Sequence, residues 1–166
     1  IYWYALVNSS NYKCAALPEL NDIYKAFHPD ILDIINNTEE SMIVARQIQD
    51  FKTPIRWHKD GVCLIGDAAH AMTPNLGQGA CQAIEDAYVL SECLQRNESL
   101  QAFTKYNEIR YKKASSIVER SRKIGRIAQL KNSAGIWLRN TILSKVPAQL
   151  TYKETKSMLD IYEHIL

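Results

Sequence analysis

The pattern of hydrophobic and polar positions predicts short strands in the first part of the chain. Apolar and aromatic residues fill positions 1–7, which favours a strand. A loose alternation over 42–51 predicts another strand, and the apolar run 62–65 is typical of a strand buried on both faces. Turn signals at Thr53-Pro54 and Lys59-Asp60-Gly61 separate these segments.

Helical spacing of apolar residues dominates elsewhere. In the longest such segment the residues in phase are Phe103, Tyr106, Arg110, Ala114, Ile117, Ser121, Ile124 and Ala128. The predicted helices are 18–27, a short one from 31 that ends at Asn36-Asn37, 78–95, a long one capped by Asn97 or Ser99, 133–145 and the tail after Thr151.

Composition narrows the protein class only slightly. The 166 residues are 46% hydrophobic and 23% charged, with a formal net charge of +2, as in an ordinary soluble globular protein. No apolar run is long enough for a transmembrane helix, and the apolar start lacks the basic region of a signal peptide. The cysteines form no CxxC pair and no zinc-type spacing with histidine, so we expect no metal site, and free thiols in a cytoplasmic protein.

The stretch from Val62 to Leu94, VCLIGDAAHAMTPNLGQGACQAIEDAYVLSECL, carries the candidate chemistry. A predicted strand delivers Asp67 at its carboxyl end, where α/β sheets place ligand sites. A carboxylate there accepts strong hydrogen bonds from sugar-like hydroxyls. Gly77-Gln78-Gly79 then opens a helix whose free N–H groups stabilise nearby negative charge. The segment therefore suits a polar, partly anionic ligand.

This stretch closely resembles the class A flavoprotein monooxygenases of the para-hydroxybenzoate hydroxylase type. The resemblance rests on Gly66-Asp67-Ala68-Ala69-His70, Pro74, Gly77-Gln78-Gly79 and Glu85-Asp86-Ala87 with Leu90, and it extends over most of residues 1–130. One departure is Ala80-Cys81, where the family often has Asn at the second position.

The resemblance implies roles for six residues toward FAD. Asp67 would hydrogen-bond the ribityl hydroxyls, and the Pro74 backbone, the one catalytic candidate, would lie against the flavin ring near the carbon that holds the hydroperoxide. Amides around Leu76, Gly77, Gln78 and Gly79 would face the pyrimidine edge and stabilise the reduced anion. NADPH or NADH would reduce the flavin, and a small, aromatic organic substrate would be hydroxylated or epoxidised.

The expected fold class is α/β, mostly helical in this chain. We expect a C-terminal fragment of a Rossmann-like FAD-binding domain joined to the end of a substrate-domain sheet. The predicted divisions are 1–50 for the end of the substrate-binding domain, 51–95 for the FAD-binding segment and 96–166 for C-terminal helices.

Two further expectations follow from what the sequence lacks. It holds neither the GxGxxG that binds the ADP pyrophosphate nor the middle Asp-Gly motif of the family, so the chain alone should bind FAD weakly or not at all. It also begins without methionine, so we expect a larger protein whose N-terminal half is the missing partner.

Several residues also have a purely structural interpretation. Asp67 alone could cap a helix or turn. His70 is expected to pack and hydrogen-bond near the loop, and Glu85 and Asp86 to make structural contacts, because adjacent helical residues point about 100° apart. The basic stretch 105–131 favours a solvated helix face over a nucleic-acid-binding or membrane-binding surface. The sequence does not decide whether the protein forms a homo-oligomer. Alternatives to a monooxygenase are a non-catalytic helical interaction module and a related flavin reductase or halogenase.

Overall fold

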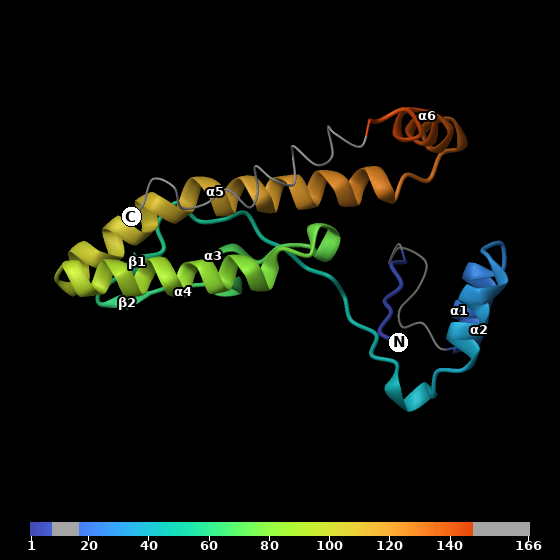
Figure 1. Cartoon of the computed structure of the whole chain (residues 1–166), viewed down its shortest axis with the longest axis horizontal. Coiled ribbons are helices and arrows are strands. Elements are labelled where there is room, and N and C mark those ends of the chain that lie inside the picture. Colours follow the sequence, from blue (N-terminus) through green and yellow to red (C-terminus); the bar gives the residue numbers. More distant parts are fainter. Residues whose placement is uncertain (8–16, 148–166) are drawn as a thin grey trace. The chain divides into compact units, whose positions relative to one another are not determined.

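The structure is a computed structural model that describes residues 1–7 and 17–147. Two compact units, Ile1–Ser121 and Arg122–Leu166, are described separately below (Figure 1). Cys14 lies outside the described residues, as does the predicted tail helix after Thr151. Within these, no helix combines the length and apolar character needed to cross a bilayer.

The first unit begins with two short helices, α1 (Leu17–Tyr24) and α2 (Pro29–Asn36), which pack against each other through buried Leu20 and Ile35. His28 caps α2, since its Nδ1 accepts from the backbone N–H of Asp30 at 3.4 Å. Pro29 suits the first helical position, where no intrahelical N–H bond is needed. Both helices confirm their predictions, although α1 ends earlier than expected.

The predicted strands at 1–7 and 42–51 are wrong for this structure. Residues 1–7 have no regular secondary structure, and a short 3₁₀ helix, η1 (Glu40–Met42), precedes an irregular segment through Phe51. A strand exists only when its backbone groups pair with another strand, and no described residue supplies a partner to either segment. Local strand propensity led to the prediction, but it does not by itself form the hydrogen bonds between strands that define a sheet.

The described residues form one small sheet, a two-stranded hairpin. β1 (His58–Lys59) pairs antiparallel with β2 (Val62–Cys63), and Leu64 N–H extends the pairing to the Trp57 carbonyl at 2.7 Å. Asp60 and Gly61 both have positive φ, 49° and 81°, as the tight two-residue turn of a hairpin requires. The expectation of a strand buried on both faces is wrong here, because Val62 is 62% exposed.

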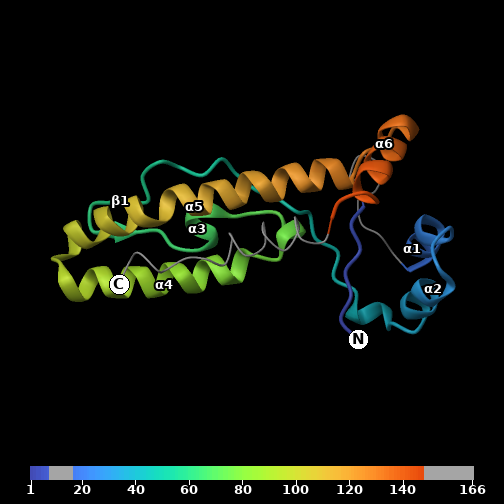
Figure 2. The ribbon, with the colours of Figure 1, turned by 45° about the horizontal axis from the view of Figure 1, so that its top comes forward.

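After the hairpin the chain forms α3 (Asp67–His70), the 3₁₀ helix η2 (Pro74–Leu76), α4 (Gly79–Arg96) and α5 (Ser99–Ala128). Helices α3 and α4 lie beside α5 (Figure 2). The shared core is built from residues with at most 5% exposure: Trp57, Ala69, Val89, Cys93, Ala102, Tyr106, Ala114, Ile117 and Val118. Trp57 is fully buried between His70 and Tyr106, at ring distances of 5.4 and 5.7 Å. Asn107 of α5 holds this segment by accepting from Trp57 N–H at 2.7 Å.

The second unit contains the end of α5 and α6 (Ser133–Leu143), which confirms the predicted helix at 133–145. Asn132 caps α6 through its side-chain oxygen, which accepts from the Gly135 N–H. Arg139 donates to the carbonyls of Ile127 and Ala128, which satisfies C-terminal backbone acceptors of α5.

The α/β expectation is therefore met only in part. The described chain is mostly helical, with one two-stranded sheet in place of a substrate-domain sheet. The domain divisions after residues 50 and 95 stay a prediction.

Candidate functional site

The turn at Gly66-Asp67 is held in a conformation that suits glycine. Gly66 has φ 56° and ψ −138°, and a Cβ added there would lie 3.2 Å from the Ala83 Cβ on α4. This close approach places the turn directly against the second turn of α4. Asp67 follows as the first residue of α3, exposed and without a hydrogen bond or ion pair to the described residues. Its carboxylate is thus available to a ligand.

The other five predicted residues form the loop that leads into α4. Pro74 and Leu76 lie in η2, Gly77 ends it in the left-handed conformation at φ 63°, and Gln78 precedes Gly79 at the start of α4. A Cβ on Gly77 would meet no atom within 4 Å, so space is open beside the loop. No side chain caps the N-terminus of α4, which leaves its first N–H groups for another acceptor.

A buried carboxylate fixes the turn from behind. Asp86 of α4 has no exposed surface and accepts from Gly66 N–H at 2.8 Å, from Arg110 Nε at 2.7 Å and from His70 Nε2 at 2.6 Å. Arg110 comes from α5, and its side chain is 1% exposed. One carboxylate therefore joins α3, α4, α5 and the Gly66 turn.

The same guanidinium satisfies two more residues of α4. Arg110 Nη1 donates to Glu85 Oε2 at 2.5 Å, and Nη2 donates to Gln82 Oε1 at 2.8 Å. Lys113 adds a contact to Glu85 at 3.3 Å. The predictions that Glu85 and Asp86 make structural contacts and that His70 packs and hydrogen-bonds near the loop are confirmed.

The network keeps Asp86 ionised. Burial acts to raise the pKa of this carboxyl, but hydrogen bonds from His70, Arg110 and Gly66 outweigh it and hold the pKa below its usual value. Its contribution to stability is complete above the pKa of the unfolded chain and is lost as the pH falls through the lower folded-state pKa. At neutral pH the turn is thus anchored by a charged acceptor.

Gly66→Ala tests how strictly the turn is fixed. We expect a loss of about 1–3 kcal/mol in the free energy of unfolding, because the backbone conformation is strained for alanine and the new methyl crowds Ala83. Gly77→Ala is the matched control, since it has positive φ but open space around its Cβ. Urea unfolding followed by circular dichroism measures both, and an equal or smaller loss for Gly66→Ala would contradict the close packing.

Residues 30–121, more than half of the chain, match the family model described as "FAD binding domain". This chain belongs to the FAD-binding domain family of class A flavin monooxygenases. The resemblance found from the Gly66–Leu90 motif is confirmed.

Curated relatives include monooxygenases and epoxidases. The chain is 38% identical over 146 residues to aurachin C monooxygenase/isomerase of Stigmatella aurantiaca, which covers 87% of this chain and 38% of that protein. It is 47% identical over 94 residues to 2-heptyl-3-hydroxy-4(1H)-quinolone synthase of Pseudomonas aeruginosa, covering 55% of this chain and 24% of that protein. It is 41% identical over 106 residues to a chloroplastic zeaxanthin epoxidase of an Oncidium hybrid cultivar, covering 60% and 16%. The chain thus spans less than half the length of each relative.

A solved structure shares the fold. The chain aligns with Klebsiella pneumoniae HpxO complexed with FAD and uric acid at a TM-score of 0.80 and 23% identity, covering 86% of this chain and 37% of that one. FAD is therefore present in a structure with this fold.

The residues of the Asp67–Gly79 segment fit the flavin end of FAD. The carboxylate of Asp67, which has no partner among the described residues, matches a ligand rich in hydroxyls. The uncapped α4 N-terminus matches a ligand edge that carries negative charge. The open space beside Gly77 leaves the loop backbone accessible. These three features lie on one continuous segment from α3 to α4.

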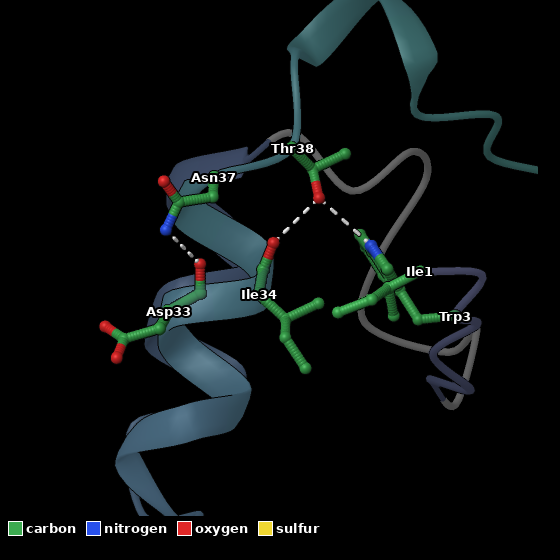
Figure 3. Close-up of a pocket in the computed structure, with 6 residues that line it drawn as sticks. All are labelled: Ile1, Trp3, Asp33, Ile34, Asn37 and Thr38. Carbon is green, nitrogen blue, oxygen red and sulfur yellow. Dashed lines mark hydrogen bonds between the residues drawn. The ribbon is translucent and has the colours of Figure 1, made fainter.

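A separate pocket of roughly 350 Å³ lies beside α2 (Figure 3). Ile1, Trp3 and Thr38 are among its lining residues, and the Thr38 hydroxyl accepts from Trp3 Nε1 at 3.0 Å while donating to the Ile34 carbonyl at 2.7 Å. None of the six predicted cofactor residues lines it. It lies in the part of the chain predicted to belong to the substrate-binding domain.

Sequence reasoning missed the residues that hold the site from behind. The sequence pattern predicts nothing for Thr73 and Asn75, and it gives Arg110 and Ser121 only a place in the helical phase of the long helix. One signal was available, because Arg110 and Ser121 interrupt the apolar face of the long helix. A polar residue on a buried helix face needs a buried partner.

Proposed function

We propose that this chain is the flavin-contacting part of an FAD-dependent, NAD(P)H-using monooxygenase that hydroxylates or epoxidises a small organic, and preferably aromatic, substrate. The observation that carries the proposal is the Asp67 turn, which Asp86 anchors against the second turn of α4, together with the uncapped N-terminus of that helix. Family membership and relatives that are monooxygenases and epoxidases support it.

In this proposal each predicted residue acts on the bound cofactor. Asp67 accepts hydrogen bonds from the ribityl hydroxyls, and backbone N–H groups near Leu76, Gly77, Gln78 and Gly79 face the pyrimidine edge. The backbone at Pro74 lies against the ring. Bound FAD supplies electron transfer from the nicotinamide and activation of oxygen. The chain contributes orientation of the ring and stabilisation of its negative charge.

The pyrophosphate of FAD needs residues that this sequence does not carry. We propose that a dinucleotide-binding half outside these 166 residues completes the cofactor site. We also propose a cytoplasmic location, which suits the supply of nicotinamide. The protein that joins this half to the 166 residues is called the extended protein below.

FAD titration of the two forms tests the proposal. We expect the 166-residue chain to bind FAD weakly or not at all and the extended protein to bind about one FAD per chain, by absorption of the bound flavin and of flavin released on heating. NAD(P)H-dependent oxygen consumption stimulated by an aromatic substrate would then support the activity. An extended protein that folds but takes up no FAD would overturn the proposal and favour the interaction module.

A further inference from the structure

Helix α5 holds the candidate flavin segment at two separate points. Arg110 grips Asp86, which anchors the turn before Asp67, and Ser121 binds the loop that contains Pro74. Arg110 and Ser121 lie eleven positions apart in the sequence, which is about three helical turns and roughly 16 Å along the axis. Both side chains are buried, with 1% and 0% exposure, so they project from the packed face of α5.

The contact at Ser121 is a closed ring of four hydrogen bonds. Ser121 Oγ donates its single proton to the Thr73 carbonyl at 2.6 Å. The Thr73 hydroxyl, 2.9 Å from Ser121 Oγ, must therefore be the donor in their second contact. Asn75 Nδ2 closes the ring by donating to Thr73 Oγ1 at 2.8 Å and to the Ser121 carbonyl at 3.2 Å.

This ring lies next to the backbone that is to face the flavin. Thr73 directly precedes Pro74, and Asn75 lies within η2, between Pro74 and Leu76. Within the loop itself, the Gly77 N–H donates to the Pro74 carbonyl at 3.0 Å. Side-chain bonds to α5 therefore supply most of the polar contacts that fix the loop.

We propose that α5 sets the separation between the ribityl-facing turn at Asp67 and the ring-facing loop at Pro74–Gly77, with Ser121 as the positioning residue of the loop. The inference rests on the proposed function, because the loop matters through the flavin edge that it faces. A rigid helix fixes this separation better than the loop does by itself. The site is then preorganised, so that little free energy is spent on ordering the loop when the ligand binds.

Ser121→Ala removes the hydroxyl and breaks the ring. In the 166-residue chain we expect amide hydrogen exchange over 71–79 to rise roughly three- to tenfold, because the hydrogen bonds of the Ser121 hydroxyl to the loop are lost. Ser116→Ala is the matched control, since Ser116 is an exposed serine of α5 whose hydroxyl donates to the Lys113 carbonyl in the same helix. Unchanged exchange in Ser121→Ala would overturn the inference without any use of flavin.

The extended protein tests the flavin side. We expect Ser121→Ala to bind oxidised FAD nearly as well as the wild type but to weaken the preference for reduced over oxidised FAD by about two- to tenfold, read from the reduction potential of the bound flavin. Asn75→Ala, which removes two bonds of the ring, should act in the same direction, and Ser116→Ala should not. A merely structural serine would lower the melting temperature and leave the potential unchanged.

The outcomes separate the two proposals. Faster exchange with a lowered potential supports the positioning role, and faster exchange with an unchanged potential overturns it. A wild-type extended protein that binds no FAD overturns the proposed function and, with it, the role of Ser121 toward flavin.

Discussion

Replacement of Arg110 by leucine is expected to lower the free energy of unfolding by about 3–5 kcal/mol. The guanidinium bonds to Asp86, Glu85 and Gln82, and the two carboxylate side chains are 0% and 11% exposed. Without Arg110, buried negative charge loses its main partner, a greater cost than the loss of the hydrogen bonds alone. Since single domains are stable by only about 5–15 kcal/mol, the variant should approach unfolding at room temperature.

Urea unfolding monitored by circular dichroism measures this loss. Arg96→Leu is the matched control, because Arg96 pairs with Glu92 on the surface of α4 with a side chain that is 60% exposed. Exposed pairs contribute less than about 1 kcal/mol, so this variant should remain close to the wild type. A loss below about 1 kcal/mol for Arg110→Leu would show that the buried charges are solvated or protonated in the native protein.

Replacement of Asp67 by alanine is expected to weaken FAD binding to the extended protein by about ten- to hundredfold. A charged acceptor contributes about 1.5–3 kcal/mol through its hydrogen bonds, and each 1.4 kcal/mol corresponds to a factor of ten. Stability should change by no more than about 0.5 kcal/mol, because the exposed carboxylate has no partner among the described residues. Loss of affinity with retained stability marks a ligand contact, and a helix cap would show the reverse.

Flavin fluorescence quenching on titration with FAD gives the affinity. Asp67→Asn keeps the shape and an acceptor oxygen, so it should recover part of the loss. Asp22→Asn, at an exposed acid of α1 whose contact with Lys25 is 3.8 Å long, serves as the control. Wild-type affinity in Asp67→Ala would remove this residue from the cofactor site.

Helices were predictable because their information is local. The apolar spacing of three and four residues in α2, α4, α5 and α6 recurs within a few turns and coincides with the observed helices. The flavin motif was predictable for a related reason, since its glycines, proline and aspartate stand close together in the sequence. The hairpin turn at Asp60-Gly61 was equally local.

Strands could not be judged in the same way. Residues 1–7 and 42–51 have a composition that suits strands, but a strand requires a partner, and composition does not reveal whether one is present. Val62 and Cys63 form a strand because His58 and Lys59 lie across a two-residue turn. The extent of burial on that strand then depended on neighbours in space.

The sequence by itself determined the helical segments and the family, and it singled out the residues proposed to contact the cofactor. Tertiary structure alone decided what holds those residues in place, because Asp86 and Arg110 are separated by 24 positions and Thr73 and Ser121 by 48. Hydrogen bonds over such distances leave no periodic trace in the sequence. They form only when α5 packs against α4 and buries the polar groups, whose need for partners then selects one arrangement of the turn and the loop.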